Sequence, residues 1–182
     1  MDAIIKADLY RYTGQTGFRA FMKCLLTPGF RYTYCFRKVS RHGKFSLPGA
    51  FYRLFYYHYT FKFGFQINHN TKVGKGLVIQ HFGPIVINKQ AVIGDNCYIA
   101  HNVTIGQTNR GERKGCPTIG NKVWIGTGAV IVGRITVGDN VLIAPNTFVN
   151  FDIPADSVVI GSPAKVIANK EATADYIVNT VD

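Results

Sequence analysis

Hydrophobic residues recur at every sixth position through the second half of the chain. Between residues 119 and 149 this series consists of Ile119, Ile125, Ile131, Val137, Ile143 and Val149. Gly or Ala follows most of these residues, and a small or β-branched residue often stands four places on. A period of six fits neither an α-helix, with about 3.6 residues per turn, nor a flat strand, with a period of two. It predicts a parallel β-helix, in which short strands wind round a triangular prism and the aliphatic residues point inward.

The same period continues toward the N-terminus, with two interruptions. Earlier members of the series are Ile67, Val73, Ile79, Ile87, Ile93, Ile99 and Ile105. Ile79 and Ile87 are eight residues apart, and Ile105 and Ile119 are fourteen apart, so the segment 107–117 does not fit a regular coil. Irregular polar segments on a rigid scaffold commonly carry function, so we expect the chemistry at these two interruptions.

The first 65 residues follow a different pattern, with apolar residues three and four positions apart. This spacing predicts a helix from Asp2 to about Leu26, broken near Gly14 and Gly17, and two further helices over 30–39 and 47–63. We therefore predict a mainly β protein with an α-helical N-terminal segment (1–65), a β-helix domain (66–168) and a polar C-terminal tail (169–182). The tail is expected to fray or to lean on a neighbouring subunit.

Charge and aromatic residues concentrate in the N-terminal segment. The net charge of the chain is +11, and residues 1–65 hold eleven Lys and Arg against two acids, a balance of +9. Eighteen of the twenty-four aromatic residues lie in the same segment. Two interpretations remain open: attachment to an anionic membrane surface, or aromatic side chains that pack on the prism while the basic ones face water. No nucleic-acid-binding module is recognisable, so nucleic acid is not an expected partner.

The cysteine pattern and the hydropathy of the sequence indicate the cellular compartment in which we expect the protein. The four cysteines are widely spaced and form no CxxC pair, which argues against a zinc knuckle or a disulfide framework. We expect a cytoplasmic protein, since a reducing compartment suits free cysteines and the sequence shows neither a secretory signal nor a long apolar span.

Two histidines fall in the repeat region. His81 lies in the first interruption, in the string IQHFGPIV, where it can project into a cleft and act as a general base, or simply fill a corner. His101 lies in a regular repeat, IAHNVT, and is expected to point outward. No third histidine stands in a neighbouring repeat, so no metal site is expected. The second interruption carries Arg110, Arg113 and Lys114, which suit either a phosphorylated ligand or a solvated loop.

Four strings between Phe65 and Ile167 resemble the hexapeptide-repeat acyltransferases, and among them the serine acetyltransferase branch: VGKGLVIQHFGPIVI, IGDNCYIAHNVTIGQT, IGNKVWIGTGAVIVG and IGSPAKVI. The resemblance implies a left-handed parallel β-helix, a homotrimer and acetyl-CoA as the acyl donor. It implies that CoA lies between neighbouring prisms against Thr104, Gly106, Gly126, Thr127, Gly128, Ala144, Gly161 and Lys165. It also implies that His81 removes the proton from the acceptor hydroxyl.

The resemblance is incomplete at the acceptor site. The residue before the catalytic histidine is Asp in serine acetyltransferases and is Gln80 here, and the Asp that orients the histidine is matched by Gln66. An Arg-His pair of the family is matched by Gly115 and Cys116. We expect Gln66 and Gln80 to orient His81, and Gln80, Cys116 and Arg113 to contact the acceptor.

These departures favour a neutral acceptor, such as a sugar hydroxyl of a surface-polysaccharide precursor, because the ammonium of serine needs a carboxylate partner. Lipid-linked acceptors of that kind would give residues 1–65 a role at the inner face of the membrane. The alternatives are a serine acetyltransferase, a non-catalytic trimeric scaffold and a metal-dependent hydratase.

Overall fold

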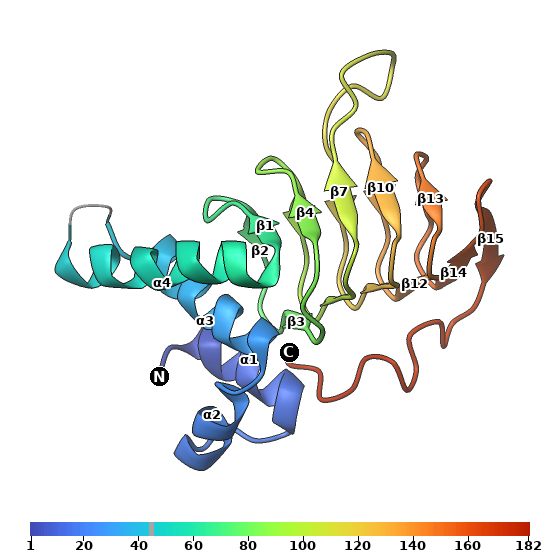
Figure 1. Ribbon diagram of the computed structural model, residues 1–182. Helices are drawn as coiled ribbons and strands as arrows, with labels where there is room; N and C mark the ends of the chain where they lie inside the picture. The colour runs from blue at the N-terminus through green and yellow to red at the C-terminus, as the bar shows by residue number, and fades with distance from the viewer. Residues whose placement is uncertain (44–45) are drawn as a thin grey trace.

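A computed structural model describes residues 1–43 and 46–182, and it shows a parallel β-helix with a bundle of helices at one end (Figure 1). The helices are α1 (Ala3–Thr13), α2 (Phe18–Cys24), α3 (Pro28–Arg41) and α4 (Leu47–Phe63). We call residues 1–63 the head. No helix in the described ranges combines the length and the apolar character needed to cross a bilayer.

The strands form three sheets, one for each side of the prism. Sheet A contains β1 (Phe65–Ile67), β4 (Ile85–Ile87), β7 (Thr104–Gly106), β10 (Val130–Val132) and β13 (Phe148–Val149). Sheet B contains β2 (Lys72–Val73), β5 (Val92–Ile93), β8 (Thr118–Ile119) and β11 (Thr136–Val137). Sheet C contains β3 (Val78–Ile79), β6 (Tyr98–Ile99), β9 (Trp124–Ile125), β12 (Val141–Ile143), β14 (Ser157–Ile160) and β15 (Lys165–Ala168). All neighbours pair in parallel except β14 and β15, which are antiparallel.

The six-residue series forms the core of the prism, which confirms the predicted β-helix. Ile125, Ile131 and Ile143 have no exposed surface, and Ile119 is 1% exposed. The strand register also confirms both interruptions. Val130 pairs with Phe148, eighteen residues on, which is one regular coil. Phe65 pairs with Ile85, and Thr104 pairs with Val130, so those coils contain two and eight extra residues.

Glycine and asparagine both shape the corners. A Cβ on Gly126 would lie 2.6 Å from the backbone nitrogen of Pro145 in the next coil, so only Gly allows this close stacking. Several left-handed positions are held by asparagines, for example Asn96 (φ 58°) and Asn140 (φ 53°), and others by glycines such as Gly128 (φ 72°). Asn tolerates this conformation better than most residues do, which is why it serves at these turns.

The helices of the head begin and end close to where the sequence predicts. Gly14 ends α1 in a left-handed conformation, with its N–H donating to the Tyr10 carbonyl at 2.7 Å. However, α3 is longer than the predicted 30–39, because Pro28 at its first turn already has the backbone angle that a helix requires. Ser46 caps α4 by accepting from the Gly49 N–H at 3.1 Å. Lys44 and Phe45, within the predicted connection 41–48, lie outside the described residues.

The head closes the open end of the prism. Side chains of α3 and α4, among them Tyr32, Phe36 and Tyr56, share one apolar core with the residues of the first coil. Tyr32 and Tyr56 both donate to the carbonyl of Ile67, and a Cβ on Gly29 would overlap the Ile79 carbonyl. These contacts confirm the interpretation in which many of the aromatic residues pack on the prism.

A buried ion pair joins the head to the first coil. The Arg37 guanidinium donates to both oxygens of Asp8, at 2.9 and 3.2 Å, and the side chains are only 5% and 2% exposed. Arg37 also donates to the Val73 and Gly74 carbonyls, and the Leu77 N–H donates to Asp8 at 3.0 Å. Each buried charge therefore has both an opposite charge and hydrogen-bond partners, as burial requires.

The C-terminal tail does not fray, contrary to expectation. It runs back along sheet C toward the head, and the chain ends beside β3 (Figure 1). Ala172 packs with Leu142 and Ala144, and the rings of Tyr176 and Trp124 meet at 5.0 Å. The Asn96 side chain exchanges two hydrogen bonds with the backbone of Val181, at 2.8 and 3.0 Å. The tail thus covers the outer side of its own β-helix, because sheet C carries large apolar side chains outward there.

Candidate functional site

His81 and His101 lie side by side at one corner of the prism. His81 is exposed and follows β3, and His101 is half-buried and follows β6. Their ring centroids are 5.9 Å apart with an interplanar angle of 84°, an edge-to-face contact. The Nδ1 atom of His101 is buried and has no hydrogen-bond partner among the described residues. His101 therefore does not simply point outward, as its regular repeat suggested.

The register of sheet C explains why the two rings meet. Ile79 of β3 pairs with Ile99 of β6, and each histidine stands two residues after its isoleucine. The same step places Thr127, Pro145 and Gly161 after β9, β12 and β14, so these residues continue along the corner. We call the line from His81 to Gly161 the histidine corner. This spacing was visible in the sequence, and it was the signal that could have linked His101 with His81.

The two glutamines expected to orient His81 line different cavities. Gln80 lines a cavity of about 850 Å³ between α1, α2, β3 and the tail, together with Thr13, Gln15 and Lys23. Gln66 lines a smaller cavity of about 350 Å³ between α4 and β4. In the described part of the chain neither glutamine makes a hydrogen bond with His81, so their orienting role stays a prediction.

Neither cavity is lined by a carboxylate of the described residues. The two acids of the head are occupied elsewhere, Asp8 with Arg37 and Asp2 with Arg41. The polar groups beside Gln80 are amides, hydroxyls and the Lys23 ammonium, together with the Arg11 guanidinium. Such a lining suits a hydroxyl-rich or anionic molecule better than it suits an ammonium group.

The loop 107–117 is a hairpin that projects from the corner between sheets A and B (Figure 1). Its base is closed by two hydrogen bonds between Thr108 and Gly115, both at 3.0 Å. Arg113 is paired with Asp152 at 3.0 Å, with both side chains substantially exposed. Cys116 is half-buried, and burial raises the pKa of its thiol, which disfavours the reactive thiolate. The structure therefore places the expected acceptor contacts Arg113 and Cys116 in a loop at a different corner from His81.

The residues expected to hold CoA gather along the histidine corner and on sheet A. The turn after β9 contains Gly126, Thr127 and Gly128, and Ala144 follows β12 in the next coil. Two further residues, Thr104 and Gly106, lie on β7. Packing accounts for Gly126, and also for Gly128, where a Cβ would lie 2.3 Å from the Asn146 side chain. At Gly106 the nearest atom to a Cβ is only the side chain of Val132, at 3.4 Å, so the strand surface is open there. Lys165 is exposed at the start of β15.

Comparisons with known proteins agree with the repeat and with the fold. Residues 116–150 match the family model described as bacterial transferase hexapeptide (six repeats). A serine acetyltransferase of Helicobacter pylori is 43% identical over 104 residues, which cover 57% of this chain and 61% of that protein.

Two solved structures show the same overall fold. The Neisseria gonorrhoeae serine acetyltransferase in complex with serine superposes with a TM-score of 0.71 at 28% identity, and the match covers 91% of this chain and 68% of that one. The Brucella abortus serine acetyltransferase in complex with coenzyme A gives a TM-score of 0.72 at 27% identity, with coverage of 91% and 66%.

The repeats, the three-sided stack of parallel sheets and the family match define this chain as a hexapeptide-repeat β-helix protein. Within that class it is similar to the serine acetyltransferases, in sequence over the repeats and in structure over the head as well. The match spans about three fifths of the length of the Helicobacter pylori and Synechococcus elongatus relatives, and 35% and 30% of two Arabidopsis thaliana ones.

Proposed function

We propose that this protein is an acetyl-CoA-dependent O-acetyltransferase in which His81 is the general base. The observation that carries the proposal is the position of His81, exposed at the first interruption of the repeat and in contact with His101. The similarity to serine acetyltransferases, one of them solved with coenzyme A, supports the donor.

The proposed reaction transfers one acetyl group. His81 accepts the proton of the acceptor hydroxyl while the hydroxyl oxygen attacks the carbonyl carbon of the thioester. The C–S bond of the thioester then breaks. The proton passes from His81 to the departing thiolate, so the products are an acetyl ester and CoA. A correctly placed general base contributes roughly 10²–10⁴-fold to the rate of such a step.

His101 is proposed to keep the His81 ring in position. Its ring packs edge-on against that of His81 from the same corner of the next coil. His101 thus supplies what the family's aspartates supply elsewhere, a side chain that restricts the orientation of the catalytic ring.

The acyl donor is proposed to lie along the histidine corner, against Thr127, Ala144 and the open surface at Gly106. We also propose a homotrimer, in which sheet A faces the neighbouring subunit. The outward residues Val86 and Phe148 of that sheet are 39% and 40% exposed in the single chain, which suits an interface. Sedimentation equilibrium tests the trimer, and a monomeric mass at micromolar concentration would refute it.

Two acceptors are supported by different observations. L-Serine is the first candidate, because the relatives are named serine acetyltransferases. A neutral sugar hydroxyl is the second, because Gln66 and Gln80 stand where the resemblance implies aspartates, which leaves the ammonium of serine without those carboxylate partners. In an oligomer the loop 107–117 of a neighbouring subunit could also approach the acceptor. Glu112 is the one acidic residue in that loop.

The acceptors can be distinguished by the release of CoA from acetyl-CoA, with L-serine and with nucleotide sugars offered in parallel. The matched variant is Gln80→Asp, which places a carboxylate beside His81. If serine binds poorly for lack of a partner for its ammonium, this variant should raise kcat/KM for serine about fivefold, the value of one exposed ion pair. Saturable release with serine in the wild-type protein supports the first acceptor, and release with a sugar alone supports the second. No release with either, in protein that binds CoA, would contradict the proposed activity.

A further inference from the structure

Helix α4 is apolar on the face that looks away from the protein. Its inner face, with Gly49, Tyr56 and Phe63 buried, packs on α3 and on the first coil. On the opposite side, residues at three- and four-residue spacing form a stripe of large exposed side chains: Leu47 (89% exposed), Phe51 (58%), Leu54 (69%) and Phe61 (84%). Such spacing places them on one side of the helix, with exposed His58 among them. We call these residues the α4 stripe.

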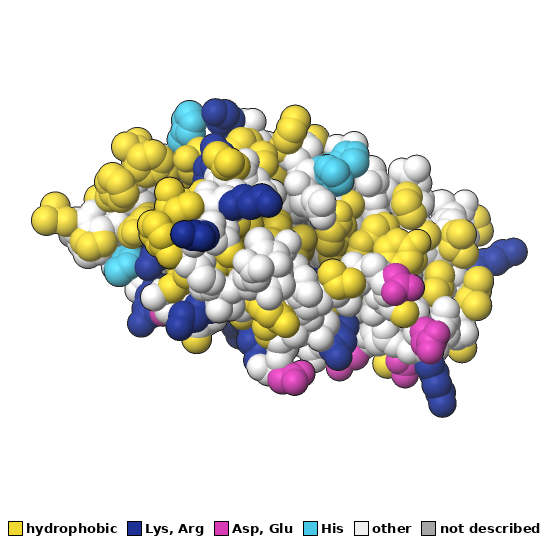
Figure 2. Space-filling view, turned by 90° about the horizontal axis from the view of Figure 1, so that it is seen from below, with side chains coloured by type: hydrophobic (Ala, Val, Ile, Leu, Met, Phe, Trp, Pro, Cys, Tyr) yellow, Lys and Arg dark blue, Asp and Glu magenta, His cyan; other side chains and the backbone are white. Residues whose placement is uncertain are grey.

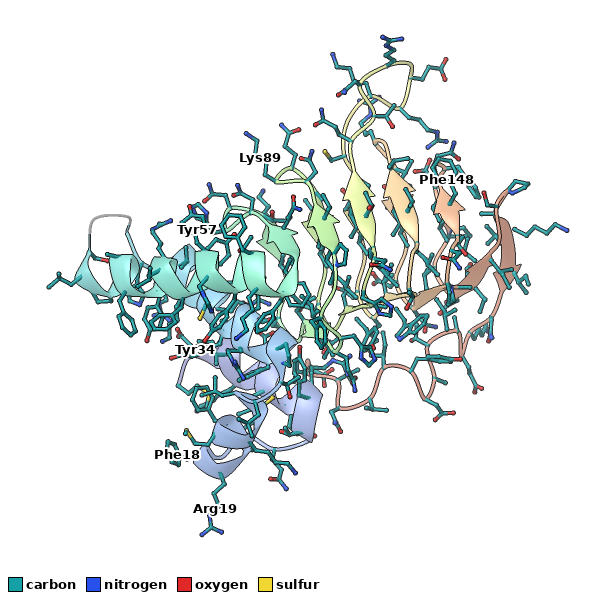
Figure 3. All side chains as sticks on the ribbon, viewed as in Figure 1. Phe18, Arg19, Tyr34, Tyr57, Lys89 and Phe148 are labelled. Carbon is teal, nitrogen blue, oxygen red and sulfur yellow. The ribbon has the colours of Figure 1, made fainter. Side chains whose placement is uncertain are left out.

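The stripe is more than the scattered apolar exposure of an ordinary surface. A helix with apolar residues on both faces normally has both faces covered, and a contiguous apolar patch marks an interaction site. Hydrophobic side chains gather over the helical end of the molecule, with lysines and arginines around them (Figure 2). Tyr57, which is 50% exposed, stands at the border of the stripe (Figure 3).

The segment that carries the stripe is strongly basic. The helical repeat of about 100° per residue places Lys62 on one flank of the stripe, whereas Arg53 lies nearer the packed face, where its Nε atom is buried. The segment 1–65 has a balance of +9. Its two acids, Asp2 and Asp8, are already paired with Arg41 and Arg37. In the described part of the head, the positive charges around the stripe therefore have no other carboxylate within the same segment to offset them.

We propose that the α4 stripe rests on the surface of an anionic lipid bilayer. Because the other side of α4 is packed on the protein, the helix must lie along the membrane plane. Its apolar side chains then enter the headgroup region, while the long lysine and arginine side chains reach the lipid phosphates. A second copy of the chain is a poorer occupant, because two heads of the same strong positive charge would repel each other. The proposal rests on the head alone and would stand if the acetyltransferase assignment failed.

The test is cosedimentation of the full-length protein with vesicles of phosphatidylcholine alone and of equimolar phosphatidylcholine and phosphatidylglycerol. We expect binding to the anionic vesicles, weakened by salt at about 1 M, where the screening length falls to about 3 Å. The double variant Phe51→Ala/Phe61→Ala should lower the partition coefficient roughly tenfold or more, since two large side chains no longer enter the lipid. Ile167→Ala is the matched control, because Ile167 is 55% exposed and lies on β15, at the far end of the molecule from α4 (Figure 1).

The results distinguish a lipid bilayer from a second copy of the chain as the partner of the α4 stripe. Loss of binding in the double variant, with Ile167→Ala binding as the wild type does, supports the proposal. A second pair of substitutions, Leu47→Ser with Leu54→Ser, should give the same loss and guards against a folding defect in the first. Wild-type protein that stays in the supernatant with both vesicles overturns it, as does a double variant that binds normally. If the wild type ignores vesicles and the double variant sediments as a smaller assembly, the stripe is a contact between copies instead.

Discussion

Replacing Asp8 with Ala should destabilise the protein by about 3–5 kcal/mol, the usual cost of breaking a buried ion pair from one side. The size follows from the geometry, since Arg37 loses two hydrogen bonds to Asp8 and keeps a charge in a site that is only 5% exposed. The Leu77 N–H loses its partner as well. The Arg37 guanidinium cannot avoid this penalty by becoming neutral, because arginine stays positively charged in proteins.

Replacing Arg37, the other partner of the pair, should lower the free energy of unfolding by an amount that depends on pH. Burial is the largest influence on Asp8 and raises its pKa, against the lowering effect of Arg37. Without Arg37 the carboxyl can take up a proton and become neutral. A pKa raised in the folded state means that the folded protein binds more protons than the unfolded chain, so stability falls as pH rises. The penalty of Arg37→Met should therefore shrink between about pH 7 and about pH 5, while that of Asp8→Ala should not.

The measurement is urea unfolding followed by far-ultraviolet circular dichroism, at one protein concentration for all variants because assembly contributes to stability. Arg113→Ala is the matched control. Its pair with Asp152 has a similar length, 3.0 Å, but is 45% and 61% exposed, so its loss should cost at most about 1 kcal/mol. If Asp8→Ala also costs less than about 1 kcal/mol, the pair does not hold the head to the first coil and the reasoning from burial is wrong.

Three further predictions concern the tail, the thiols and the paired rings. Tyr176→Ala should shift the fluorescence of Trp124, the single tryptophan, to longer wavelength, because water then reaches the indole; an unchanged spectrum would mean that the tail does not cover it. Burial raises the pKa of Cys24, Cys35 and Cys97 to about 12, whereas Cys116 is only half-buried, so Cys116 should react with a thiol reagent near pH 8 faster than the other three, and Cys116→Ser should abolish that faster phase. His101→Ala should reduce kcat about tenfold with little change in KM for acetyl-CoA and should alter the pH profile of kcat, whereas a mere packing role would leave that profile unchanged.

The core of the prism could be predicted from the sequence because every inward-facing position requires the same kind of side chain. A side chain enclosed by three sheets must be aliphatic, so the six-residue series identified Ile119, Ile125 and Ile131 as core, and the two interruptions fell where the coils are longer. The corners were harder to predict. Asparagines such as Asn140 share the left-handed positions there with glycines such as Gly128, because Asn tolerates this conformation better than most residues do.

Two features that depend on contacts outside a single repeat were not predicted. His101 stands in a regular repeat, and the expectation that it points outward overlooked the spacing that pairs Ile79 with Ile99 and brings its ring against His81. The tail looks polar and loose, yet it is held by the large apolar side chains that sheet C turns outward, Trp124 among them. A single-chain pattern carries no information about which faces a distant segment will cover, and for that reason the path of residues 169–182 was not foreseen.

His81 is proposed to act as the general base in acetyl transfer from acetyl-CoA. The most direct measurement is CoA release by the wild-type protein and by His81→Ala, with CoA affinity of both measured by calorimetry. We predict that His81→Ala lowers kcat by roughly 10²–10⁴-fold while CoA binds to both proteins equally well. Equal turnover by the two proteins, with either acceptor, would contradict it.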